Sequence, residues 1–141
     1  MAALDADAII AALALAPHPE GGWYRETFRD APAGGVRGAL AHIYYLLRAG
    51  ERSRWHRFDA VEVWHFYAGE PLALHIAEGD GPVRTVVLGT ALADGQAAHA
   101  VVPAHAWQAA EPLGAYTLAG CTVAPAFQFE GFELAPEGWA P

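Results

Sequence analysis

The sequence predicts an all-β sandwich or barrel with one short helix at its N-terminal end. Segments rich in aromatic and β-branched residues recur along the chain at short, regular spacing. Glycine, proline and aspartate separate these segments, which is typical of turns between strands. The 141 residues suit one domain, and no repeat, low-complexity tract or linker divides them. We therefore expect residues 1–141 to form a single domain.

The elements are predicted in chain order from local patterns. A helix is expected over residues 5–16, because Asp5 can cap it and apolar residues follow at helical spacing until Pro17. The tail from Pro136 is expected to fray. The expected strands cover residues 23–28, 41–47, 53–58, 61–67, 72–76, 83–88, 100–102, 107–110, 116–123 and 127–134.

Composition excludes several classes of protein. Eight basic against 16 acidic residues give a formal net charge of -8, so there is no basic footprint for nucleic acid or an anionic membrane. Cys121 is the one cysteine, which excludes an internal disulfide and a cysteine-rich zinc module. The apolar start carries Asp5 and Asp7 instead of a positive charge, so it does not resemble a secretory signal. We expect a cytoplasmic protein without a membrane span.

The most informative pattern spans residues 50–69, which begin and end with glycine and hold His56 and Glu62 between them. It resembles the first motif of the cupin superfamily, in which a glycine precedes a His-x-His pair, a glutamate and a closing glycine. A later segment resembles the second cupin motif. There, His105 stands in place of a turn glycine and Gln108 in place of a histidine.

Further segments make the chain similar to one family of that superfamily, DUF985 or Cupin-5. The similarity covers nearly the whole chain in the family's order, although Ala126 replaces a glycine. The segments that carry it are residues 18–26, 43–47, 53–57, 62–66 and 120–127. The resemblance implies a cupin jelly-roll β-barrel, a small-molecule pocket in the barrel mouth and a homodimer. Its relatives include sugar-nucleotide epimerases and isomerases, germin-like proteins and metal-dependent dioxygenases, and the family's own chemistry is unsettled.

One interpretation is a metal-dependent cupin, an oxygenase or a lyase. The resemblance places two histidine ligands at His56 and Phe58, but a phenylalanine cannot bind metal. It also places ligands at Glu62 and Gln108. An imidazole nitrogen, a carboxylate oxygen and an amide oxygen could hold a divalent ion such as Zn, Mn, Fe or Ni together with waters.

The interpretation we favour needs no metal. The protein would bind a small polar molecule, a sugar or a nucleotide-like compound, and could act as a sugar isomerase or epimerase. His56 would be the base and Glu62 would fix its tautomer. Either Tyr44 or Tyr116 would supply the acid. A third alternative is a non-catalytic binding module in which His56 and Glu62 only form hydrogen bonds.

Alternation along the strands places other side chains near this pair. Trp64 shares a strand face with Glu62 and could stack on a ligand. Arg54 lies two residues before His56, so alternation predicts the same strand face for both, and Arg54 could bind an anionic group of a ligand. If residues 18–26 close the mouth of the pocket, they add Glu20, Tyr24 and Glu26.

Overall fold

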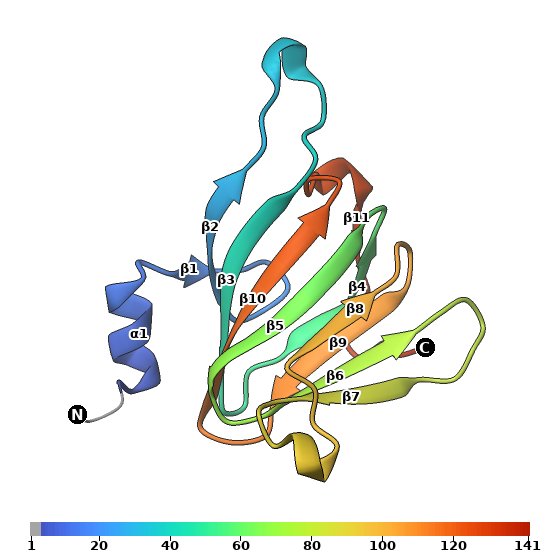
Figure 1. Ribbon diagram of the computed structural model, residues 1–141. Coiled ribbons are helices and arrows are strands. Elements are labelled where there is room, and N and C mark those ends of the chain that lie inside the picture. The colour runs from blue at the N-terminus through green and yellow to red at the C-terminus, as the bar shows by residue number, and fades with distance from the viewer. Residues whose placement is uncertain (1–3) are drawn as a thin grey trace.

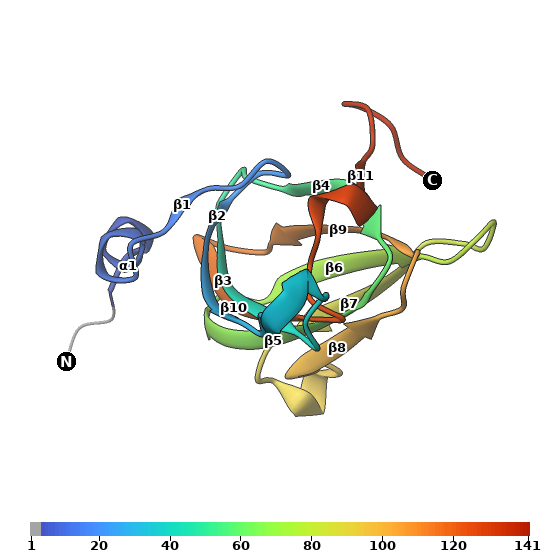
Figure 2. The ribbon, with the colours of Figure 1, turned by 90° about the horizontal axis from the view of Figure 1, so that it is seen from above.

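The computed structural model describes residues 4–141, which form two antiparallel β-sheets facing each other (Figures 1 and 2). The first sheet has the order β1 (Ala16–Pro17), β2 (Trp23–Arg29), β3 (Ala41–Arg48), β10 (Tyr116–Ala124), β5 (Val61–Gly69) and β8 (His99–Val102). The second sheet has the order β11 (Phe132–Leu134), β4 (Ser53–Phe58), β9 (Trp107–Pro112), β6 (Leu72–Ala77) and β7 (Arg84–Leu88). The all-β prediction is confirmed.

The helix α1 (Ala6–Ala12) begins as predicted, with the Asp5 carboxylate accepting a hydrogen bond from the Ala8 backbone amide at 2.8 Å. It ends earlier than residue 16, because Ala14 adopts a left-handed φ of 53° and the chain then enters β1. The prediction of a helix over 5–16 is wrong at this end. The helix lies outside the sandwich, where Ile9 packs against β3 (Figure 2).

The C-terminal part differs from the expected strand over 127–134. The chain there forms the short 3₁₀ turn η3 (Phe129–Gly131) and then β11, which pairs with β4. Two further 3₁₀ turns are η1 (Ala33–Gly35) and η2 (Leu92–Asp94). The tail is not simply frayed, because the ring of Trp139 lies 4.6 Å from that of Trp107, centroid to centroid.

Apolar side chains from both sheets form the core between them. The largest cluster contains Tyr45, Trp64 and Leu74, all at most 1% exposed. A second cluster is formed around Phe58 and Val123, and the aromatic residues of the C-terminal segment pack against it. Within residues 4–141 there is no helix with the length and hydropathy needed to span a membrane.

Candidate functional site

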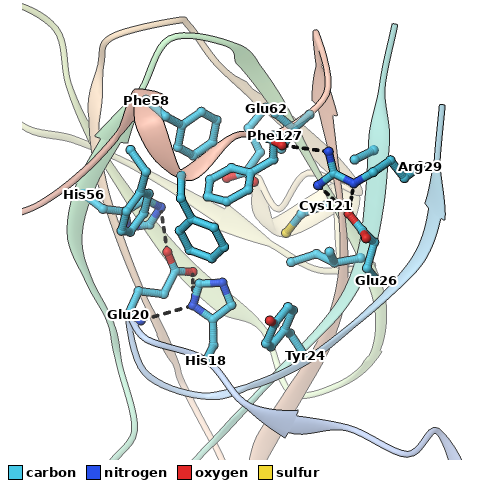
Figure 3. Close-up of a pocket in the computed structure, with 15 residues that line it drawn as sticks. His18, Glu20, Tyr24, Glu26, Arg29, His56, Phe58, Glu62, Cys121 and Phe127 are labelled. Atoms are coloured by element: carbon cyan, nitrogen blue, oxygen red, sulfur yellow. Dashed lines mark hydrogen bonds and ion pairs between the residues drawn. The ribbon is translucent and has the colours of Figure 1, made fainter. Parts of the chain in front are cut away.

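A cavity of about 140 Å³ lies between the sheets, next to the Phe58 and Val123 cluster (Figure 3). Strands β2, β3 and β10 form one wall, and β4 lies opposite. His56 of β4 and Glu62 of β5 line this cavity, and they are 2% and 5% exposed. The two residues that the first cupin-like motif singles out therefore lie on the wall of the same cavity.

The turn between β1 and β2 brings a second acidic group to His56. Glu20 is 6% exposed, and its Oε2 lies 3.0 Å from His56 Nε2. The Arg54 backbone amide donates to the Glu20 carbonyl at 2.8 Å, which ties the turn to β4. Figure 3 shows the Glu20 carboxyl between the rings of His56 and His18. The expectation that Glu20, Tyr24 and Glu26 line the pocket agrees with the lining of this cavity.

The hydrogen bonds of His56 define where its proton lies. Its Nδ1 is 2.6 Å from the Arg54 carbonyl oxygen. A carbonyl only accepts, so Nδ1 carries the hydrogen and Nε2 faces Glu20 with its lone pair or a shared proton. Burial lowers the pKa of His56 to about 4, and burial also raises the pKa of Glu20. The proton shared by this pair is therefore held by the Glu20 carboxyl.

His18 supports the same carboxyl from the other side. Its Nδ1 accepts a hydrogen bond from the Glu20 backbone amide at 3.1 Å and lies 3.9 Å from Glu20 Oε1. Burial lowers the pKa of His18 although Glu20 opposes the shift, so the ring is neutral at neutral pH. The ring edge packs on Tyr24 with centroids 4.5 Å apart. His18 thus positions Glu20 through the backbone.

Glu62 is the least satisfied polar group of the cavity. Among the described residues, its Oε1 finds no hydrogen-bond partner. Burial, together with the nearby Glu20 carboxyl, raises the pKa of Glu62 to about 8, although Gln108 and Trp64 act to lower it. Glu62 is therefore protonated at neutral pH.

Gln108 and Trp64 bind each other in the core. The Trp64 indole Nε1 donates to Gln108 Oε1 at 2.8 Å, and both side chains are at most 2% exposed. Neither residue is part of the cavity lining. The prediction that Trp64 stacks on a ligand is not supported, because its ring is enclosed by core side chains.

The predicted metal donors do not fit a divalent ion. Gln108 Oε1 is occupied by the Trp64 indole, and His56 Nε2 faces Glu20. Within residues 4–141, no three or more His, Cys, Asp or Glu side chains are grouped as a metal site requires. Of His56, Glu62 and Gln108, only Glu62 keeps a donor atom without a partner among the described residues, so the three do not form a metal site.

The two tyrosines predicted as the acid lie away from the cavity. Ala41, Ile43 and Tyr45 face inward from β3, so alternation turns Tyr44 outward, where it packs on Tyr67. The Tyr116 hydroxyl donates to the Leu4 carbonyl at 3.1 Å, near α1. No tyrosine hydroxyl from these positions can act on a molecule in the cavity.

Arg54 also faces away from His56, contrary to the prediction from parity. The register of β4 with β9 shifts between Ser53 and His56, so alternation is broken there. Ser53 and His56 are both buried, and Arg54 donates to the Ala135 carbonyl at 2.9 Å on the outer side. The sequence contains no clear signal for this irregularity.

A partly exposed arginine lines one side of the cavity. Arg29 Nη1 donates to the Phe127 carbonyl at 2.9 Å, and its Nη2 lies 2.7 Å from Glu26 Oε1 (Figure 3). These contacts join β2 to the C-terminal segment that carries Phe127. Arg29 and His18 were not predicted as site residues. The sequence signals for His18 are its place at the start of the family-like segment 18–26 and in the turn before Gly21 and Gly22.

Comparisons with known proteins agree with this architecture. A family model described as "Cupin superfamily (DUF985)" matches residues 7–135. A protein from Shewanella oneidensis has 37% sequence identity and a TM-score of 0.90, with 94% of this chain and 85% of that chain covered. A hypothetical protein from Leishmania major has 30% identity and a TM-score of 0.86, with 94% and 88% covered.

More distant structures share the fold alone. Oxalate decarboxylase from Bacillus subtilis has 16% identity and a TM-score of 0.64, with 86% of this chain and 30% of that chain covered. No curated protein matches the chain. The likeness to oxalate decarboxylase supports the jelly-roll architecture, and it carries no statement about the reaction.

Proposed function

This chain belongs to the DUF985 family of the cupin superfamily, and we propose that it binds a small molecule in the cavity and transfers a proton to or from it. The observation that carries the proposal is the 3.0 Å contact between Glu20 Oε2 and His56 Nε2 on the cavity wall. A buried carboxyl paired with a histidine is a proton-transfer group, because each partner stabilises the other's change of protonation.

The Glu20 and His56 pair moves a proton in a defined way. Nδ1 of His56 stays protonated because it donates to the Arg54 carbonyl. When Glu20 accepts a further proton, the shared proton can therefore move from Glu20 Oε2 to His56 Nε2. This assigns the role of the base to His56 together with Glu20, whereas the sequence analysis pairs His56 with Glu62.

Glu62 is the acid in this proposal. Its pKa of about 8 keeps it protonated at neutral pH, and it lines the same cavity as the pair. An isomerase needs one group that removes a proton and another that donates one, and here the base is the pair of Glu20 and His56 while the acid is Glu62. Glu62 thus has the role that the sequence analysis assigns to a tyrosine.

The size of the cavity limits the molecule. Its volume of about 140 Å³ is close to that of an engineered cavity in another protein, about 150 Å³, that binds benzene. A nucleotide sugar exceeds this volume, so only part of such a molecule could enter. We therefore propose a compound of about the size of benzene, with an apolar body and one polar end.

Proton transfer is tested with a small carbonyl compound in heavy water. Cyclohexanone fits the volume, and its α-hydrogens exchange when a base removes one while an acid supports the carbonyl oxygen. We expect the wild type to speed deuterium incorporation, measured by NMR, over Glu20→Gln and Glu62→Gln variants. Equal rates for the three proteins would contradict the catalytic part of the proposal and leave only a binding module.

A further inference from the structure

The cavity contains two buried carboxyl groups but no free positive charge. Glu20 and Glu62 line it and are at most 6% exposed. Of the lining residues in the described chain, Arg29 is the only lysine or arginine. Its guanidinium is held by Glu26 at 2.7 Å and by the Phe127 carbonyl at 2.9 Å. The charge of Arg29 is therefore already paired.

An unpartnered acceptor points to a ligand that donates hydrogen bonds. Glu62 Oε1 has no partner among the described residues, although the side chain is only 5% exposed. Buried polar atoms are nearly always hydrogen-bonded in folded proteins. Glu62 lines the cavity, so a molecule there with an N–H or O–H group would give this carboxyl a hydrogen-bond partner.

Aromatic rings surround the space next to these carboxyls. The ring centroid of Phe127 lies 5.6 Å from that of Phe58 and 5.7 Å from that of Phe132. Tyr24 adds a further ring to the lining. Figure 3 shows the Phe58 and Phe127 rings beside the open space. The faces of such rings carry partial negative charge, so they attract cations and disfavour anions.

From these three features we infer that the cavity selects a small organic ammonium ion, an amine with an apolar body. The ammonium group donates to the Glu62 carboxyl and supplies the positive charge that the two carboxyls lack, while the body packs against the rings. An alcohol supplies the hydrogen bond without the charge, and a carboxylate adds a like charge. The inference rests on the proposed function, because it names the class of molecule for the same cavity.

The protonation of the empty cavity agrees with this selectivity. Burial raises the pKa values of both carboxyls, and for Glu62 the value of about 8 means that a proton neutralises it at neutral pH when no cation is present.

The test uses three probes that share a phenyl ring: benzylamine, benzyl alcohol and benzoate. Isothermal titration calorimetry at neutral pH measures the affinity of each for the full-length protein. We expect benzylamine to bind at least about tenfold more tightly than benzyl alcohol, and benzoate to bind most weakly. In Glu62→Gln, the ratio of amine to alcohol affinity falls at least about fivefold. Glu130→Gln is the matched control, because it removes the same charge from an exposed side chain and leaves the ratio unchanged.

The outcomes separate this inference from the proposal on which it rests. Tighter or equal binding of benzyl alcohol or benzoate would overturn ammonium selectivity while keeping the cavity as a binding site. An unchanged ratio in Glu62→Gln would also overturn it. If none of the three probes binds the wild type, the proposed small-molecule site fails together with the inference.

Discussion

Burial sets the protonation of Glu62 and His56, and each residue changes stability over its own pH range. The folded pKa of Glu62, about 8, exceeds its ordinary value of 4.5, so the folded state binds more protons and stability falls as pH rises between these values. The folded pKa of His56, about 4, is below 6.5, so stability rises with pH between these values. The pKa of His18 is also lowered, so it too makes stability rise with pH only up to about pH 6.5. Above that pH, the change that remains is the loss of stability caused by the carboxyl groups.

We therefore predict that the wild type loses stability between pH 6.5 and about 8, and that Glu62→Gln loses less. The difference is about 2 kcal/mol, because each pH unit across a titration changes the free energy by about 1.4 kcal/mol. Urea denaturation at several pH values measures it. Glu20 also has a raised pKa, so some slope persists in the variant. Identical slopes in the two proteins would show that Glu62 is not protonated in the folded state.

The second prediction at this scale concerns His56. His56→Ala removes a buried ring that contacts Glu20 at 3.0 Å and stacks on Phe58. We expect a loss of about 3 kcal/mol, from the cavity left behind and the unpaired Glu20 carboxyl. The protein still folds, because domains are stable by about 5–15 kcal/mol. Circular dichroism and urea denaturation measure this. Complete unfolding would indicate that His56 is mainly a structural residue.

At the scale of elements, the turn that carries Glu20 depends on one glycine. Gly21 has a φ of 109°, and a Cβ there would lie 2.0 Å from the Arg52 carbonyl oxygen of the chain leading into β4. The Tyr45 hydroxyl donates to the Gly21 carbonyl from the core side. The turn is therefore fixed between β3 and β4, and this close approach holds the Glu20 carboxyl against His56.

Gly21→Ala should cost about 3 kcal/mol of stability, through steric overlap and the left-handed backbone. Gly34→Ala is the matched control, since Gly34 has a φ of 82° but nothing within 4 Å of its Cβ position. That control should cost only about 1 kcal/mol. Thermal denaturation of both variants gives the comparison. Equal losses would mean that backbone strain alone, and not contact with β4, makes Gly21 necessary.

Sequence patterns located elements well and contacts between elements poorly. Alternation placed Glu62 in the interior of β5, and the turn residues located the strands to within a few positions. The same rule failed for Arg54, because an irregularity in β4 reverses its side. The partnership of Glu20 with His56 could not be predicted, since it joins a turn to a strand far along the chain. The positive φ of His105, 69°, explains why a glycine is expected at that position.

At the scale of the whole molecule, the homodimer implied by the family resemblance stays a prediction. Large apolar side chains such as Phe28 and Val101 are 55% and 49% exposed on the first sheet, which leaves apolar surface for a second copy. Multi-angle light scattering should give about 30 kDa, twice the chain mass of 15.0 kDa. A mass of one chain at micromolar concentration would contradict the dimer without affecting the cavity.

The central claim is that the cavity holds a neutral His56 that shares a proton with Glu20. Long-range ¹H–¹⁵N NMR of the histidine rings tests it most directly, across about pH 5 to about pH 8, in the wild type and in Glu20→Gln. We predict a His56 ring that is protonated at Nδ1, does not titrate in this range, and changes its Nε2 shift in the variant. A His56 that titrates near 6.5, or that carries its proton on Nε2 alone, would contradict the account.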